Sequence, residues 1–193
     1  ELLLVGFAIV LLLGGVMVRR LSPVVLILVS LAGIAAAAAA SLWLWDWDGG
    51  ATVLAGAVAT DRFGVVVRAI VLSVAAIGVV LGHHYFERSG ESRVEFYPLM
   101  LLATAGMTLF AVSADLITAF LALEILSLSL YVLTGFSSRP GSVEGAMKYF
   151  LIGAFATGFL MYGMALLYGA AGTTQLAQMA TALAQTKNPG LVV

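Results

Sequence analysis

One apolar stretch with a carboxylate in its middle constrains this chain more than any other feature. Residues 115–136, DLITAFLALEILSLSLYVLTGF, are apolar enough to cross a bilayer as a helix, yet Glu124 lies near the centre. A charge at that depth costs about 2.5–3.5 kcal/mol on insertion scales and is seldom kept without a function. Because helical residues three, four and seven apart share a face, Ser127, Tyr131 and Thr134 lie on the side of this carboxylate. We expect the polar stripe to face protein or water, and Glu124 to handle protons.

The composition of the whole chain is typical of a membrane protein. Of its 193 residues, 62% are apolar and only 10% are charged, whereas soluble domains carry about 25% charged residues. Long apolar runs alternate with short polar breaks, the pattern of a polytopic α-helical membrane protein. No basic cluster is dense enough for nucleic acid, and the lack of cysteine excludes disulfides and thiolate metal sites. The expected surrounding is therefore the lipid bilayer.

Six membrane spans and one surface helix are predicted. The spans cover about residues 2–18, 22–45, 65–81, 97–112, 115–136 and 143–168. A moderately amphipathic segment at 174–185 is predicted to lie on the surface as a short helix. Residues 49–64 are too polar and too rich in glycine to span, and they predict a hairpin or a surface loop. The predicted fold is thus an all-α transmembrane bundle that forms a single region over residues 1–193.

Several side chains are suited to the starts of these helices. Pro23 fits the first turn of the second span, and Ser142 is the expected N-cap of the sixth. Glu95 and Asp115 place a carboxylate at the positive end of the fourth and fifth helices. We expect no further role for Glu95 and Asp115.

The distribution of charge predicts how the chain is oriented. Lys and Arg concentrate in cytoplasmic loops, and most arginines of the loops fall on one side of the predicted spans. These are Arg19, Arg20, Arg88, Arg93 and Arg139. Acidic residues dominate the other side, where Arg62 beside Asp61 is the exception. Both the N-terminus and the tail are therefore expected to face away from the cytoplasm.

Lys148 is the second candidate site residue. It lies about one turn into the sixth span, and Glu144 precedes it by four residues, the favourable order for an ion pair on a helix. A lysine that extends its charge toward water at the cytoplasmic end is the alternative. A lysine desolvated inside a bundle can lose its charge, which a nearby carboxylate opposes. Such a pair could pass protons by changing charge state.

The remaining charged residues favour structural roles. Arg68 lies just inside the third span, and we expect it to pair with Asp61, seven residues earlier, or to extend outward. His83 and His84 point about 100° apart on a helix and cannot easily share a metal, so interfacial solvation is expected for both. The sequence contains no phosphate-binding loop, dinucleotide fingerprint, haem motif or metal cluster. No redox centre is therefore expected in this chain.

Segments in the second half of the chain resemble one family closely. They are EFYPL at 95–99, ADL at 114–116, LEILSLSLYVL at 123–133, EGAMKYF at 144–150 and GAAGT at 169–173. As a set they resemble the antiporter-like membrane subunits of proton-pumping NADH-quinone oxidoreductase, bacterial complex I, and among them the subunit N family. Leu123 stands before Glu124 where related subunits and cation/proton antiporter subunits usually carry Trp. This difference favours subunit N.

The resemblance implies both a fold and a function. Members of this family carry two inverted repeats, each a half-channel with a broken helix. Glu124 would be the fifth-helix glutamate of the first half-channel, and Lys148 the sixth-helix lysine typical of subunit N. Proton translocation would be coupled to electron transfer from NADH to quinone, with NADH, FMN, iron–sulfur clusters and quinone bound in partner subunits and no cofactor in this chain. The expected partners are other membrane-arm subunits in a bacterial cell (inner) membrane.

The length of the chain departs from that family pattern. It begins with Glu1 rather than Met, and the broken seventh helix and the second repeat are missing. We therefore expect a portion of a longer subunit, with an incomplete half-channel that does not pump alone. Two other functions stay open: a subunit of a multisubunit cation/proton antiporter without redox partners, and a purely structural subunit in which Glu124 forms a permanent ion pair.

Overall fold

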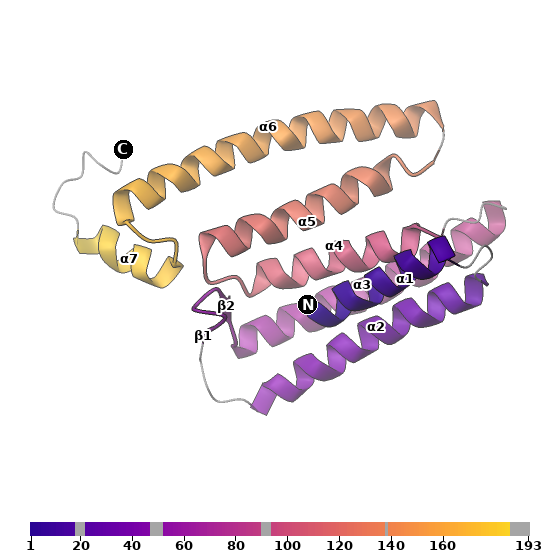
Figure 1. The fold of residues 1–193 in the computed structure, drawn as a ribbon, viewed down its shortest axis with the longest axis horizontal. Coiled ribbons are helices and arrows are strands. Elements are labelled where there is room, and N and C mark those ends of the chain that lie inside the picture. The colour runs from indigo at the N-terminus through magenta and orange to yellow at the C-terminus, as the bar shows by residue number, and fades with distance from the viewer. Residues whose placement is uncertain (18–21, 47–51, 90–93, 138, 186–193) are drawn as a thin grey trace.

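The computed structural model describes residues 1–17, 22–46, 52–89, 94–137 and 139–185. Its helices are α1 (Leu2–Met17), α2 (Pro23–Trp43), the short 3-10 helix η1 (Leu44–Asp46), α3 (Arg62–Ser89), α4 (Phe96–Ala111), α5 (Leu116–Thr134), α6 (Pro140–Ala171) and α7 (Leu176–Gln185). Two short antiparallel strands, β1 (Thr52–Val53) and β2 (Val58–Ala59), form a hairpin between α2 and α3 (Figure 1). The predicted all-α membrane bundle is confirmed.

Each predicted span overlaps one of the helices α1 to α6. Among the described residues, α2, α3, α5 and α6 are long and apolar enough to cross a membrane, whereas α1 and α4 are apolar helices of 16 residues each. Helix α3 extends well beyond the predicted 65–81, because its polar C-terminal residues His83 to Arg88 continue the helix. The hairpin lies within the segment 49–64, where a hairpin or loop was expected. The predictions for Arg19, Arg20 and Arg93 fall outside the described residues.

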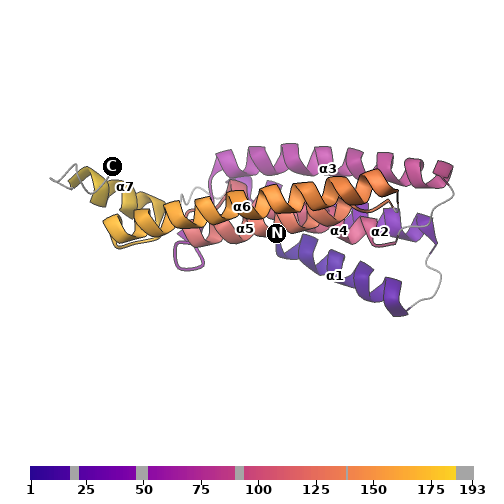
Figure 2. The same cartoon turned by 90° about the horizontal axis from the view of Figure 1, so that it is seen from above.

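Helix α4 lies at the centre of the bundle. It contacts α1, α2, α3 and α5, and Figure 2 shows α1 and α3 on opposite sides of the layer that contains α4, α5 and α6. The core between these helices includes the buried side chains of Leu4, Leu26, Leu72, Val79 and Leu101. Helix α6 lies at the edge, where it contacts α5 and α7, and none of its residues is buried. The buried core thus lies among α1 to α4. Helix α5 packs against α4, and α6 packs against α5.

Two helix starts form as the sequence predicted. Ser22 is the N-cap of α2 and Pro23 is its first residue, a position where the missing N–H of proline costs nothing. Asp115 caps α5, since its Oδ1 accepts hydrogen bonds from the backbone N–H groups of Ile117 (2.9 Å) and Thr118 (3.3 Å). These bonds satisfy donors that have no partner within the helix. The helix that carries Glu124 therefore begins at a fixed residue.

The prediction that Ser142 caps α6 was wrong. Helix α6 begins at Pro140, with Arg139 as the N-cap residue, because proline at the first position starts the helix three residues earlier than predicted. The Ser142 hydroxyl instead donates to the carbonyl oxygen of Thr134 on α5, at 2.5 Å. Glu95 is the N-cap residue of α4, but its carboxylate makes no capping hydrogen bond. The α5–α6 connection is therefore closed by a bond between the two helices.

Main-chain hydrogen bonds join three segments at the end of the bundle where α5 begins. They run from Ala59 N to Val112 O, Ala114 N to Ala57 O, Leu116 N to Thr174 O and Leu176 N to Ala114 O, at 2.8–3.0 Å. The first two join the hairpin to the α4–α5 loop, and the last two join that loop to the segment before α7. Figure 1 shows the hairpin and α7 at this same end. The start of α5 and the end of α6 are thus held close together.

Helices α4 and α5 approach each other closely at Gly106. A Cβ at this position would lie 2.7 Å from the backbone N of Leu126 and 2.8 Å from the carbonyl O of Ala122. Backbone atoms inside a helix cannot move aside, so only glycine permits this crossing. The two contacted residues flank Glu124 on α5. The close approach therefore fixes where Glu124 lies along the bundle relative to α4.

Gly106→Ala is expected to destabilise the protein by about 1–3 kcal/mol through overpacking, although alanine normally favours a helix over glycine. The measurement is the thermal denaturation midpoint of the purified complex that contains the full-length subunit. Gly6→Ala in α1 is the matched control, because a Cβ at Gly6 would meet no atom within 4 Å. Equal midpoints for the two variants would show that the α4–α5 crossing is not close.

Candidate functional site

Glu124 lies in the contact between α5 and α6. Its carboxylate Oε1 accepts a hydrogen bond from the Thr157 hydroxyl on α6 at 3.0 Å, and its side chain is half-buried. Among the residues that the structure describes, Glu124 has no ion-pair partner. The described chain thus provides no permanent counter-ion of the kind that a purely structural glutamate would need. The prediction that Glu124 faces protein or water is confirmed, because its carboxylate contacts the Thr157 hydroxyl of a neighbouring helix.

The residues of the polar stripe on α5 make two kinds of contact, one with α6 and one within α5. Tyr131 faces α6, where its ring packs edge-on against Tyr149 and Phe150, with centroids 4.8 and 5.7 Å apart. Its hydroxyl lies against Gly153, where any Cβ would overlap it. The Thr134 hydroxyl instead bonds the carbonyl of Leu130 on its own helix at 2.8 Å. Two of the predicted stripe residues, Glu124 and Tyr131, therefore lie in the seam between α5 and α6.

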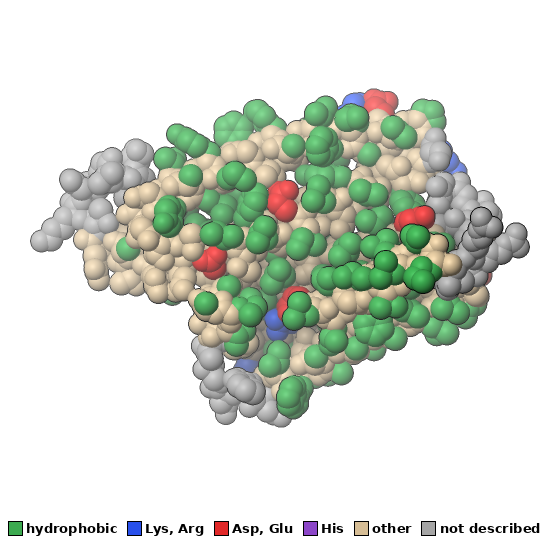
Figure 3. All heavy atoms as spheres, viewed as in Figure 1, with side chains coloured by type: hydrophobic (Ala, Val, Ile, Leu, Met, Phe, Trp, Pro, Cys, Tyr) green, Lys and Arg blue, Asp and Glu red, His purple; other side chains and the backbone are tan. Residues whose placement is uncertain are grey.

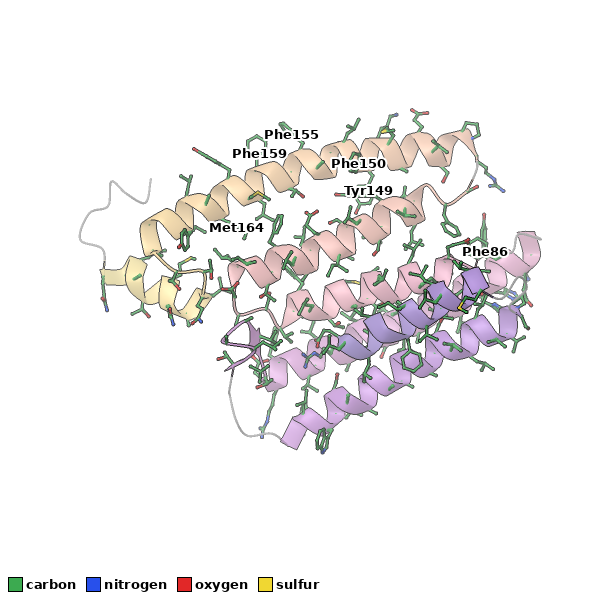
Figure 4. The ribbon with its side chains drawn as sticks, in the orientation of Figure 1. Phe86, Tyr149, Phe150, Phe155, Phe159 and Met164 are labelled. Carbon is green, nitrogen blue, oxygen red and sulfur yellow. The ribbon has the colours of Figure 1, made fainter. Side chains whose placement is uncertain are left out.

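Aromatic side chains mark the two faces of α6. Figure 4 shows Tyr149 and Phe150 in the space between α5 and α6, whereas Phe155 and Phe159 point away from α5. Phe155 and Phe159 are 71% and 64% exposed. The inner face carries Gly153 and Thr157, whose small side chains let α5 approach. The outer face is apolar at Phe155 and Phe159, which the other described residues leave largely uncovered.

Lys148 forms the predicted ion pair but lies on the outer face. Its Nζ is 2.5 Å from Glu144 Oε1, and the two side chains are 69% and 65% exposed. Figure 3 shows a basic and an acidic group together at the outer edge of α6. Lys148 precedes Thr157 by nine residues, about two and a half helical turns, so the two residues lie on opposite sides of α6 and about 13 Å apart along its axis. The structure therefore does not bring Lys148 and Glu124 together.

Arg68 is paired, but not with the predicted partner. Its Nε and Nη2 lie 2.9 and 2.7 Å from Oε1 of Glu1, and only 7% of its side chain is exposed. Asp61 instead accepts a hydrogen bond from the backbone N–H of Gly64 at 2.7 Å. Seven residues of helix rise about 10 Å, which is too far for a direct pair. The partner comes from the start of α1, which no local spacing could indicate.

A cavity of about 80 Å³ with a mixed polar and apolar lining adjoins this ion pair. Ser41 on α2 and Thr108 on α4 are among its lining residues. Their hydroxyls donate to backbone carbonyls of their own helices, so their oxygen lone pairs can still accept a bond. The cavity lies among α1 to α4, and Glu124 does not line it. The Arg68–Glu1 pair and the Glu124 seam are therefore separate polar features.

The two histidines differ in environment. His83 Nδ1 lies 2.7 Å from the Tyr97 hydroxyl on α4, and its side chain is only 15% exposed. His84 is 62% exposed, and both rings approach Glu87 at 3.8–4.0 Å. Interfacial solvation therefore holds for His84 but was wrong for His83, which joins α3 to α4. In the described part of the chain, no three potential metal ligands come together.

The sequence comparisons all match membrane subunits of one kind. Residues 113–192 match the family described as NADH:quinone oxidoreductase/Mrp antiporter, TM. The chain is 47% identical over 131 residues to NADH-quinone oxidoreductase subunit N 1 of Herpetosiphon aurantiacus, an alignment that covers 67% of this chain and 27% of that protein. It is 50% identical over 113 residues to NADH-quinone oxidoreductase subunit N of Myxococcus xanthus, covering 56% and 21%. The chain thus spans about a quarter of the length of these relatives.

Solved structures share the arrangement of helices. A chain of respiratory complex I from Thermus thermophilus superposes with a TM-score of 0.75 and 36% identity, covering 94% of this chain and 40% of that one. A chain of the membrane-bound sulfane sulfur reductase, an archaeal respiratory membrane complex, gives a TM-score of 0.73 at 22% identity. At that identity the second likeness concerns the fold alone.

Proposed function

Because this chain belongs to the antiporter-like membrane subunits of the NADH:quinone oxidoreductase/Mrp antiporter family, we propose that it is part of a subunit N that moves protons. The chain is a multi-pass membrane protein. The observation that carries the proposal is Glu124, a half-buried carboxylate between two membrane helices whose described partner is a neutral hydroxyl. A carboxyl group without a fixed counter-ion can change its charge as its surroundings change.

In this proposal Glu124 holds or releases a proton when a nearby charge changes. Coulomb interactions are stronger in the low dielectric of a membrane bundle than in water, so a charge that arises close to the carboxylate alters its affinity for protons. The chain does no redox chemistry of its own. Electrons pass from NADH to quinone in partner subunits, which bind NADH, FMN, iron–sulfur clusters and quinone. Other membrane-arm subunits are the neighbours through which the two processes are coupled.

In this proposal Lys148 has a role separate from that of Glu124. Its pair with Glu144 lies on the outer face of α6, half a turn from the face that carries Thr157. Proton exchange between Glu124 and Lys148 therefore needs an intermediate group outside the described chain, which the full-length subunit would supply. The proposal assigns Lys148 to transfer along the outer face of α6 and Glu124 to transfer along the α5–α6 seam.

A cation/proton antiporter subunit is the second candidate, since the family to which residues 113–192 belong includes Mrp antiporters. Affinity purification of the tagged full-length subunit in mild detergent separates the two. We expect flavin and iron–sulfur absorbance in the purified complex, together with NADH-dependent quinone reduction that acidifies one side of proteoliposomes. A complex with membrane subunits only, and with cation-driven proton movement, would contradict the proposal and favour the antiporter.

A further inference from the structure

Most hydroxyl groups on the membrane helices bond to their own backbone. Ser30, Ser41, Ser73, Thr104, Ser129 and Thr134 each donate to the carbonyl oxygen four residues earlier. This pattern is the usual way to satisfy a hydroxyl in an apolar surrounding, because the acceptor is always within reach. A hydroxyl that gives up this local acceptor for a group on another helix is therefore unusual.

Helix α6 carries two hydroxyls of this second kind. Ser142 donates to the Thr134 carbonyl near the end of α5, and Thr157 donates to the Glu124 carboxylate near the middle of α5. Between them Gly153 leaves the space that the Tyr131 hydroxyl occupies. These contacts lie along one face of α6 and join it to α5. Of the two acceptors, only the carboxylate is titratable.

We propose that Thr157 is a positioning residue for Glu124, holding the carboxylate in the α5–α6 seam where it exchanges protons. This inference rests on the proton-transfer function proposed above. A free glutamate side chain can adopt several rotamers, and a hydroxyl bond to one oxygen selects the rotamer that faces α6. Hydrogen bonds to charged acceptors are about twice as strong as neutral ones. The bond is therefore strongest to the ionised carboxylate, and it is weaker but still made when Glu124 is protonated.

The test replaces Thr157 in the full-length subunit within the intact complex. Thr157→Val keeps the shape and removes the hydroxyl, whereas Thr157→Ser keeps the hydroxyl. Thr104→Val in α4 is the matched control, since that hydroxyl is buried and bonds only to its own helix. We expect Thr157→Val to lower the proton pumping rate about tenfold, because the loss of one charge-assisted hydrogen bond changes an equilibrium or a rate by about this factor. Thr157→Ser and Thr104→Val should retain most of the parent rate.

Infrared difference spectroscopy gives a readout that a merely structural role would not change. The carboxyl stretching band of protonated Glu124 is identified as the band that Glu124→Gln removes. It should lie at higher wavenumber in Thr157→Val, because the carbonyl loses a hydrogen bond, and at the parent position in Thr157→Ser and Thr104→Val. Native gel electrophoresis confirms that each variant complex is assembled.

The outcomes separate this inference from the proposed function. A parent-like band and pumping rate in Thr157→Val, while Glu124→Gln impairs pumping, would refute the positioning role alone. Normal pumping in Glu124→Gln would refute the proposed function, whatever Thr157 does. If Thr157→Val does not assemble, the comparison moves to Thr157→Ser, which must then keep the parent band. A shifted band in Thr157→Ser would count against the hydroxyl bond.

Discussion

Glu124→Gln in the full-length subunit is expected to lower the proton pumping of the complex about tenfold or more while the complex still assembles. Glutamine keeps the size of the side chain and can still accept the Thr157 hydroxyl bond, so packing of α5 against α6 should persist. It cannot take up or release a proton. Positioned acid–base groups contribute about 10²–10⁴-fold to proton-transfer steps, so the loss should be larger than that of any packing variant. Proton movement is measured by dye quenching in proteoliposomes with NADH and quinone.

Glu87→Gln is the matched control for this variant. Glu87 is the same residue type on a described helix, but its side chain is 58% exposed at the end of α3. Its loss should leave pumping within about twofold of the parent, because an exposed ion pair contributes little. Assembly is checked by native gel electrophoresis and by NADH oxidation with an artificial acceptor. Normal pumping in an assembled Glu124→Gln complex would remove this carboxylate from the proton route.

Arg68→Met is expected to destabilise the full-length subunit by about 3–5 kcal/mol, the usual cost of leaving one member of a buried pair without its partner. The side chain of Arg68 is 7% exposed, and its guanidinium makes two contacts to Glu1. Methionine retains much of the apolar volume, so the effect reports the pair rather than a cavity. The expected result is a strongly reduced yield of assembled complex and a lower thermal denaturation midpoint.

A double variant distinguishes a broken pair from lost packing. Arg68→Met combined with Glu1→Met removes both charges, and replacing a buried pair by apolar residues is often neutral. The double variant should therefore be more stable than Arg68→Met alone, and the losses of the two single variants should not add. Additive losses from the two single variants would show that Glu1 and Arg68 do not stabilise each other.

The sequence predicted the membrane helices and the face of Glu124 because these depend on periodicity within one helix. Runs of apolar residues located α1 to α6, and the three- and four-residue spacing placed Glu124 with Tyr131 on one side of α5. The position of the Asp115 carboxylate at the start of α5 followed from residue type and position. Each of these properties is local, and no knowledge of the neighbouring helix was needed.

Features that depend on which helices meet could not be predicted in this way. Periodicity put Lys148 and Thr157 on opposite faces of one helix, but nothing in the sequence said which face meets α5. Thr157 was not predicted as a partner of Glu124, although a hydroxyl within a membrane helix was a usable signal. Glu1 was missed as the partner of Arg68 because 67 residues separate them. Ser142 was assigned to its own helix, and its acceptor belongs to another.

The main-chain bonds that join the hairpin, the α4–α5 loop and the segment before α7 have a practical consequence for mutagenesis. Because these bonds use only N–H and C=O groups, replacing a side chain there leaves every donor and acceptor in place. An alanine scan would therefore miss these main-chain bonds and would report only the side-chain bonds of the same region, from Thr174 to Asp115 and from Gln175 to the carbonyl of Ala55. Only proline insertion, a deletion or an amide-to-ester exchange would expose the contribution of the main-chain bonds.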